Sequence, residues 1–351
     1  MPALNTEHVD VNLTNISLAY KNEMYVADKV FKRIPVPKIS DKYFQYDKNT
    51  FLRGSGVDAQ GRPNSIRKPG SRSMEINYAV SSNSFYCEQL ARNYKLTDLE
   101  AQYADTPLMP EVDATEAITE RIMIDNELAV ATKSGKRANY PTANKIQLTT
   151  GTTSWAVNTL TGGNYTSFPI SADIPNLKRG VMLGIIKAPT HILMNYATQE
   201  VLAANHEYKD QVKYTSRDGL TKGGLAPVIL GLEVLEANAQ YATSSDYTGS
   251  AFTSGYTWVD DQGQDTALVF YGGNPARLKE PSFGATFEAP DPTTGGMGYV
   301  VEVWREQWIQ SKVIEVRTSR DWKFTATDGS SSGDSANGLA TGGALISGTT
   351  L

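Results

Sequence analysis

The residue types that most often carry acid–base, nucleophilic or metal chemistry are scarce in this chain of 351 residues, which has three histidines and one cysteine. His191 opens a short apolar run, where we expect a structural histidine, and His206 falls between two candidate helices, where we expect a surface or capping residue. Cys87 lies at the start of a segment expected to be helical, where its pKa could be lowered. Because no histidine is near it in sequence, Cys87 is better interpreted as a buried, inert thiol.

Short catalytic and cofactor motifs are incomplete. Ser134–Lys136 is similar to part of a phosphate-binding loop, but Val130 stands where that loop needs its first glycine, and no Ser or Thr follows. Gly54 and Gly56 form a Gly-x-Gly pair, but a loop with prolines follows them and not the helix that a dinucleotide-binding motif requires. The acidic pair Asp260–Asp261 and the acid Asp291 lack the alternating spacing of a calcium loop and are better interpreted as turn residues. The sequence therefore predicts no catalytic, cofactor-binding or metal-binding residues, and a protein that is not an enzyme.

Composition and charge exclude several classes of protein. The chain is 40% hydrophobic and 20% charged, with 18 Tyr, 10 Phe and 5 Trp, which excludes a long disordered protein. A net charge of −5 argues against a dedicated DNA-binding domain, and a single cysteine excludes an intrachain disulfide framework. The first residues do not form a secretory signal, and no apolar run reaches the length of a membrane span. We therefore expect folding in a reducing cytoplasm and no membrane partner.

A long polar segment, residues 48–73, carries a net charge of +5 within this acidic chain. The flanking residues 43–46 and 74–80 alternate with the period of two that is typical of β-strands. We therefore predict that the two flanks pair and that the polar segment is the tip of one long β-hairpin. Loops of this length in a compact domain are usually functional or disordered. A loop that follows a nucleic-acid backbone is the weaker interpretation, because Phe51 is its only aromatic residue for stacking on bases.

Residues 85–136 are expected to be helical. Thr97–Glu100 has the spacing of a capping box and predicts a short helix that ends near Pro107. Pro110 suits the first turn of a long second helix, the spine helix, predicted over residues 110–134. One arc of this helix is apolar and is expected to face the core: Ala114, Ala117, Ile118, Ile122, Ile124, Leu128 and Ala129.

Two features of the spine helix allow further predictions. Arg121 and Asp125 lie within the apolar arc, one turn apart. An ion pair within the helix is the simpler interpretation, and a polar contact with another subunit is the alternative. Gly135 is expected to close the helix in the left-handed conformation.

The basic loop and the helical region have opposite charges, because residues 85–131 carry a net charge of −7. The loop could dock on its own helix, or on the helix of a neighbouring copy in a head-to-tail contact that generates closed rings. We predict a subunit interface formed in the loop by Arg53, Arg62, Arg67, Lys68 and Arg72, and in the helical region by Glu111, Asp113, Glu116, Glu120 and Asp125.

The remaining segments complete the predicted order of elements. Residues 26–38 contain two nearby prolines and are expected to form an extended arm that lies on another element. Residues 138–190 suggest loops, short strands and one helix near 174–183. Residues 191–240 are typical of an α/β unit, and 299–326 of β-strands around a turn near 310–312. The Gly- and Ser-rich end, residues 328–351, is expected to be a flexible tail, held in place, if at all, by a neighbouring chain.

This order of segments resembles the HK97-fold major capsid proteins of tailed phages. Ala27–Lys38 and Ser40–Lys48 closely resemble the N-terminal arm of one subgroup. Pro189–Asn195, followed by Val212–Thr215, resembles the start of its axial domain, and Pro281–Gly284 resembles the segment before its last strands. The resemblance spans about residues 20–326. It rests on short sequence motifs with a structural role and not on catalytic motifs. Residues 138–172 and the tail match nothing in it.

The resemblance implies an α+β fold with six parts. These are an N-terminal arm (1–48), an extended β-hairpin loop or E-loop (49–84), a peripheral domain with the spine helix (85–189), an α/β axial domain (190–275), a β element of the peripheral domain (276–327) and the C-terminal tail (328–351).

The function that this resemblance implies is a structural one. Many copies would form hexamers and pentamers, and these would close an icosahedral shell around double-stranded DNA, with only non-specific DNA contact. Scaffolding, portal and decoration proteins would be separate chains, and the shell would assemble in the host cytoplasm and become the capsid of the virion. The alternative is a β-rich secreted or surface protein that binds glycans through Tyr and Trp; the missing signal peptide and the spine helix disfavour it.

Overall fold

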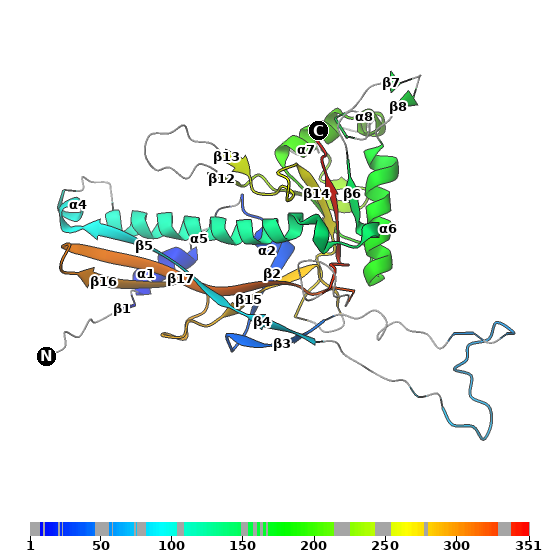
Figure 1. Cartoon of the computed structure of the whole chain (residues 1–351), viewed down its shortest axis with the longest axis horizontal. Coiled ribbons are helices and arrows are strands. Elements are labelled where there is room, and N and C mark those ends of the chain that lie inside the picture. Colours follow the sequence, from blue (N-terminus) through cyan, green and yellow to red (C-terminus); the bar gives the residue numbers. More distant parts are fainter. Residues whose placement is uncertain are drawn as a thin grey trace.

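Two six-stranded sheets organise the fold in the computed structural model of this chain (Figure 1). The first, here the spine sheet, runs along the length of the molecule beside the long helix α5 (Pro110–Gly135), and the second, the α/β sheet, lies at one end. The structure describes residues 8–9, 11–19, 22, 24–45, 56–57, 59–73, 75, 82–103, 109–148, 154–156, 160–161, 164–165, 168–213, 225–242, 254–276, 280–328 and 338–350.

The spine sheet is built around one long central strand, β17, with its neighbours on both sides. The strand order is β1-β16-β17-β15-β2, and β5 also pairs with β17. The bounds are β1 (His8–Val9), β2 (Phe31–Pro35), β5 (Glu88–Thr97), β15 (Gly284–Ala289), β16 (Val300–Glu306) and β17 (Ser311–Phe324). The predicted β-branched hairpin is therefore confirmed as β16 and β17, and its turn spans residues 307–310.

The prediction of a helix from residue 85 was wrong for its first part. β4 (Ser82–Tyr86) and β5 occupy this segment, and helix begins only with α4 (Asp98–Gln102), at the predicted capping box of Thr97 and Glu100. β5 has a sequence that would suit a helix, but it pairs with β17 from Glu88 to Thr97. Ten paired residues in a sheet outweigh a helix propensity worth only tenths of a kcal/mol per residue.

Helix α5 has the predicted length and begins at Pro110, but it is rotated relative to the predicted apolar arc. Ala114, Ile118 and Ile122 are buried against β17, whereas Ala117 is exposed and Leu128 only half-buried. The buried face also takes in polar residues: Thr115, Thr119, Asn126, Glu127 and Ser134. Several of these have partners from distant segments, as in the pair Ser17 Oγ to Thr119 Oγ1 at 2.8 Å. The hydrophobic pattern alone therefore predicted the wrong position for the buried face of α5.

Gly135 ends α5 for a different reason than expected. Gly135 is not one of the described glycines that have a positive φ angle. A Cβ atom there would lie 2.2 Å from the carbonyl oxygen of Val259. The glycine is required because the backbone of another segment passes directly over it.

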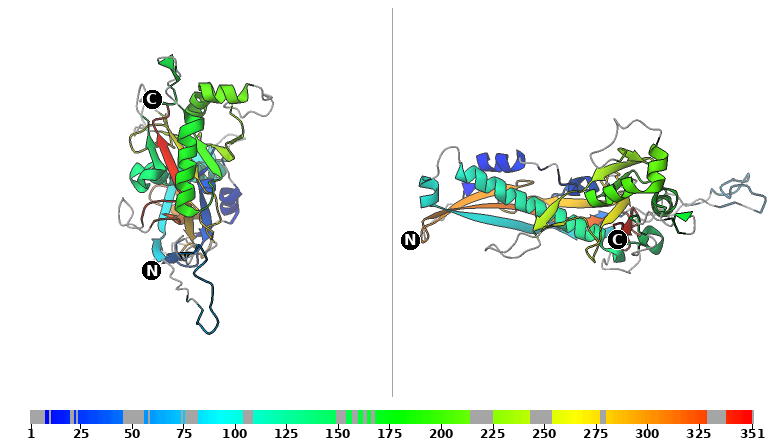
Figure 2. Two further views of the ribbon diagram at one scale, coloured as in Figure 1. Left: turned by 90° about the vertical axis from the view of Figure 1, so that its right-hand side faces the viewer. Right: turned by 90° about the horizontal axis from the view of Figure 1, so that it is seen from above.

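The α/β sheet has the order β10-β11-β9-β14-β18-β6. Its strands are β6 (Lys145–Gln147), β9 (His191–Met194), β10 (Val228–Ile229), β11 (Leu232–Glu236), β14 (Thr266–Phe270) and β18 (Gly343–Ser347). Its helices are α6 (Ile174–Ile185), α7 (Tyr196–Ala204) and α8 (His206–Val212), so the helix expected near 174–183 is confirmed. Figure 2 shows α6 along one side of this unit.

The prediction of a flexible tail was wrong for its described part. β18 is fully buried in the α/β sheet between β14 and β6 of the same chain, so no neighbour is needed to hold it. Thr349 continues the contact through its hydroxyl, 2.9 Å from that of Thr198. The composition was misleading because Gly343 is small for a packing reason: a Cβ on Gly343 would lie 2.4 Å from the Phe283 ring. The division into domains otherwise stays a prediction.

The described part of the arm contains helix α1 (Val11–Ala19), a single helical turn α2 (Ala27–Val30) and the extended β2. β2 is the edge strand of the spine sheet and pairs in parallel with β15, and Pro35 ends it. This position suits a proline, which cannot donate to a neighbouring strand. The expectation that the arm lies on another element is confirmed within the chain, but the expectation of extended chain was wrong for Ala27–Val30, which precede both prolines and form a helical turn.

A hairpin around the basic segment is present, because β3 (Ser40–Phe44) pairs with β4. Of the predicted flanks, residues 46, 74 and 76–80 lie outside the described residues, so their pairing stays a prediction. Shorter pieces complete the structure: β7 (Leu160–Thr161), β8 (Asn164–Tyr165), β12 (Gln240–Ala242), β13 (Ser254–Tyr256), the 3-10 turns Arg137–Asn139 and Thr142–Asn144, and a π-helical turn at Pro169–Asp173. Within the described residues, no helix is long and apolar enough for a bilayer.

Candidate subunit interface

The basic hairpin tip extends away from the rest of the molecule. Its described residues, 56–57, 59–73 and 75, lie beyond the α/β sheet in two views and are exposed (Figures 1 and 2). The tip is shaped by its own short-range contacts, such as the bridge between Val57 and Pro63 and the bond from Arg67 Nε to the Ser71 carbonyl at 2.7 Å. It presents the predicted basic residues Arg62, Arg67, Lys68 and Arg72 to solvent, whereas Arg53 lies outside the described residues.

The predicted acidic residues do lie along α5, but several are already paired within the chain. Glu111 binds Lys312 Nζ at 2.7 Å, and Glu120 accepts a hydrogen bond from Asn22 Nδ2 at 2.9 Å. Asp113 accepts from the Met109 amide at 3.2 Å. The remaining predicted acids are Asp125, which also has a partner, and Glu116, which is half-buried. The structure thus places the basic tip and the acidic helix far apart in one chain.

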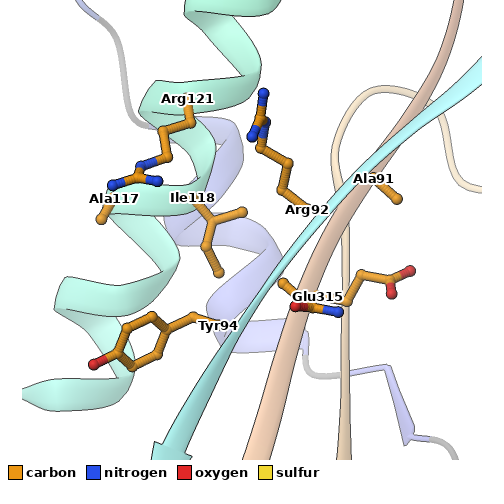
Figure 3. A pocket seen from close by; sticks show the side chains of 8 residues that line it. Ala91, Arg92, Tyr94, Ala117, Ile118, Arg121 and Glu315 are labelled. Atoms are coloured by element: carbon orange, nitrogen blue, oxygen red, sulfur yellow. The ribbon is translucent and has the colours of Figure 1, made fainter. Parts of the chain in front are cut away.

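Asp125 forms its ion pair with a residue of strand β5, and not within its own helix as the sequence suggested. Its carboxylate receives two hydrogen bonds from Arg92 of β5, at 2.7 and 2.9 Å, which raise the pKa of Arg92. Figure 3 shows Arg92 and Arg121 in the groove between β5 and α5. This open groove has a volume of about 570 Å³ and is lined by Ala91, Arg92, Asn93, Tyr94, Ala117, Ile118, Arg121 and Glu315.

Glu127 is a buried acid that the sequence interpretation did not single out. Its carboxylate accepts hydrogen bonds from the amides of Val26 and Ala27, at 3.1 and 2.8 Å, and from the indole of Trp258. Burial raises the pKa of Glu127, and these three donors oppose that shift without overcoming it. One side chain of the spine helix therefore ties the arm to the segment that precedes β14. Its position on the same helix face as Ala131 was the only sequence signal.

A second buried group of charges surrounds Arg317 of β17. Its guanidinium contacts Asp291 at 2.8 Å, Glu302 of β16, and Glu315 at 3.7 Å. Burial would raise the pKa of Asp291, but hydrogen bonds from Arg317 and Thr294 outweigh it and keep that pKa below its ordinary value. The cluster joins the loop after β15 to two central strands. Three acids and one base form a structural network, and none of the four was a predicted site residue.

The residues first considered for chemistry are structural. Cys87 is buried, and burial raises its thiol pKa to about 11, as expected for an inert cysteine, although it lies between strands and not at a helix start. His191 begins β9 and stacks on Phe270 with ring centres 5.3 Å apart, and burial lowers its pKa. His206 begins α8. Within the described residues there is no group of His, Cys, Asp or Glu that could hold a metal ion.

Comparison with known proteins gives a consistent picture. A curated relative is 24% identical over 233 residues, which cover 66% of this chain and 67% of that protein, and it is described as the major capsid protein of Pseudomonas phage JBD67. No family model matches the chain.

Solved structures match nearly the whole chain. A phage-related protein from Bordetella bronchiseptica RB50 has a TM-score of 0.68 at 18% identity, and the match covers 98% of both chains. The mature capsid of bacteriophage PhiM1 has a TM-score of 0.54 at 12% identity, covering 95% of this chain and 88% of that one. An encapsulin from Synechococcus elongatus PCC 7942 has a TM-score of 0.52 at 11% identity, covering 97% and 95%. The fold that the sequence led us to expect is therefore confirmed: the chain has the α+β, HK97-type fold of phage capsid proteins.

Proposed function

We propose that this chain is a phage major capsid protein, a structural and non-enzymatic subunit that assembles into a closed shell. The observation that carries the proposal is the match to a phage capsid structure over nearly the whole chain, together with similarity to a curated major capsid protein. The finer form of the proposal is that hexamers and pentamers close an icosahedral shell around double-stranded DNA. Nothing in these similarities favours the glycan-binding alternative.

The contents of the shell do not follow from the fold, because an encapsulin shares it. The curated relative belongs to a phage, which favours packaged DNA. Contact with that DNA would be non-specific, given a net charge of −5. Scaffolding, portal and decoration proteins would be separate partners, and assembly would take place in the host cytoplasm.

The E-loop is proposed to dock on a neighbouring copy. Its described tip is exposed, carries Arg62, Arg67, Lys68 and Arg72, and lies away from the α5 helix of its own chain. Of the predicted acids along α5, Asp113, which is exposed, and Glu116 are the best candidates to receive it, because Glu111 and Asp125 already bind Lys312 and Arg92. A head-to-tail contact of this kind produces rings, and opposite charges set its register and its rate of formation.

Charge reversal of the tip tests this docking. Arg62→Glu, Arg67→Glu and Arg72→Glu together should leave a folded subunit, because all three side chains are exposed, but should prevent rings and shells. The matched control replaces the same residues with lysine, which preserves the charge. Negative-stain microscopy and sedimentation measure the assemblies. Normal particles from the glutamate variant would refute the docking, whereas a wild-type chain that assembles neither alone nor together with the other proteins of its phage would refute the function itself.

A further inference from the structure

A row of packed aromatic rings joins the two six-stranded sheets. It begins in the α/β sheet, where the ring of His191 in β9 lies nearly parallel to that of Phe270 in β14, with 5.3 Å between their centres. Phe270 packs on Phe283 at 5.7 Å. Phe283 packs in turn on two residues of the spine sheet, Phe31 of β2 at 5.5 Å and Phe324 of β17 at 5.3 Å. We call these five side chains the joint.

The arm meets the joint at its histidine end. Lys32 of β2 donates a hydrogen bond from Nζ to the carbonyl of Gly272, two residues after β14, at 2.8 Å. The backbone of Gly272 also packs tightly on His191, because a Cβ on this glycine would lie 2.6 Å from Cε1 of the imidazole. A cation of the arm is therefore fastened to the same short piece of backbone that covers the histidine ring.

The hydrogen bonds around His191 suit a neutral imidazole. Thr190 Oγ1 lies 2.6 Å from Nδ1 and accepts a hydrogen bond from the Gly272 amide at 3.0 Å. A hydroxyl has one hydrogen to donate, and in a ring that carries its hydrogen on Nε2 the acceptor for it is Nδ1. Nε2 lies 3.4 Å from the carboxylate of Glu233. A second proton, on Nδ1, would force the Thr190 hydroxyl to turn its hydrogen away from the ring.

The charges around the imidazole also oppose a second proton. Of the charged groups that the structure describes, Lys29 and Lys32 on the arm and Glu233 on β11 act on this ring. Burial and the two lysines lower the pKa of the imidazole, and Glu233 raises it without compensating, since its side chain is 63% exposed to water. Lys187, in the connection before β9, lies over the ring of Tyr271.

We propose that His191 is an acid-sensitive switch that loosens the joint between the two sheets when it is protonated. The imidazolium is repelled by Lys29 and Lys32 and loses the hydrogen bond from Thr190, so the arm and the start of β9 separate more readily. The direction follows from linkage. Because the pKa of His191 is lower in the folded chain than its ordinary value of 6.5, the joint has its full strength above pH 6.5 and weakens as the pH falls through the lower folded value.

This switch belongs to the folded subunit, so it acts whether or not the subunit forms shells. The two sheets are the two rigid parts of the fold that the joint holds together. Loosening it lets one sheet move relative to the other while the strand pairing within each sheet stays intact.

Hydrogen exchange of the full-length, unassembled subunit tests the switch. The protection factor compares the exchange rate of an amide with that of the unfolded chain at the same pH. Between pH 7 and pH 5 it should fall several-fold for residues 31–35 and 191–194. Residues 88–97 of β5, which pair with the part of β17 that precedes Phe324, are the internal reference and should keep their protection.

His191→Phe is the matched variant, because it keeps an aromatic ring on Phe270 and cannot take up a proton. Its protection at residues 31–35 should be the same at pH 7 and pH 5. Equal protection of the wild type at both pH values would overturn the proposal, and so would an equal loss in the wild type and in His191→Phe.

Two exposed charges give a second test, in which the effects have opposite signs. Glu233→Gln removes the charge that favours the imidazolium, so the loss of protection between pH 7 and pH 5 should be larger than in the wild type. Lys29→Gln removes a cation that opposes it, so the loss should be smaller. Both side chains are exposed, so both variants should fold even if His191→Phe does not. Changes of the same sign in the two variants, or no change in either, would overturn the proposal.

Discussion

Glu127 of the spine helix accepts a hydrogen bond from the indole of Trp258, which lies 131 residues further along the chain. The same carboxylate accepts hydrogen bonds from the backbone amides of Val26 and Ala27 at the start of α2. Three segments that are distant in sequence therefore meet at one buried side chain. This contact joins the arm, the long helix and the segment that precedes β14.

Glu127→Gln is expected to destabilise the folded subunit by about 1–3 kcal/mol, because an amide group replaces one of two acceptor oxygens and then faces a backbone donor. Chemical denaturation of the unassembled subunit measures this change. Trp258→Phe is the control, since it removes one donor and leaves both amides satisfied. Equal stability of the glutamine variant and the wild type would contradict the role of the carboxylate.

Arg317→Met is expected to cost about 3–5 kcal/mol at neutral pH, because the buried Asp291 and Glu302 and the half-buried Glu315 would be left without this base. In the wild type, the pKa of Asp291 is held below its ordinary value of 3.8, so its contribution is present above pH 3.8 and is lost as the pH falls through the lower folded value.

In the variant, the carboxylates repel one another and take up protons more readily. The penalty should therefore shrink as the pH falls from about 7 to about 5, which denaturation at several pH values would reveal. Arg317→Lys keeps the charge and should show a smaller penalty with less pH dependence. A penalty for Arg317→Met that is the same at both ends of this range would show that lost packing, not charge, is responsible.

Gly135→Ala is expected to destabilise the subunit by about 2–3 kcal/mol, since the new methyl group would overlap the Val259 carbonyl and push two segments apart. Thermal unfolding provides the measurement. Gly296→Ala is the matched control, because its nearest contact is a side-chain methyl of Val300 at 3.3 Å, which can move. Equal melting temperatures for the two variants would mean that α5 can shift away from Val259 at no cost.

Cys87 is expected to react with a thiol reagent at pH 8 roughly a hundredfold more slowly than a free cysteine, because burial raises its pKa to about 11 and also blocks access. Full reactivity should return in denaturant. The rate of Ellman's reaction in the folded and unfolded subunit is the measurement. Fast reaction in the folded subunit would show that β4 and β5 open readily around this thiol.

Local patterns predicted the elements whose cause is local. The capping box at Thr97, the proline that starts α5 and the β-branched runs of β16 and β17 each gave the correct element. The resemblance carried by Ala27–Lys38 and Pro189–Asn195 gave the fold, which the comparisons confirm. The interface residues of the loop and helix stay predictions, because a contact between copies leaves no trace in one chain's own packing.

The sequence by itself determined the charge contrast between the hairpin loop and the spine helix, the inert cysteine and the class of fold, because these depend on composition and on short strings. Only the tertiary structure decided that residues 88–97 form a strand and that residues 343–347, within the glycine-rich end, form a buried one, since long-range pairing with β17 and β14 outweighs local propensity. It also decided which face of α5 is buried, because distant donors such as Trp258 satisfy polar groups there that a hydrophobic pattern assigns to solvent.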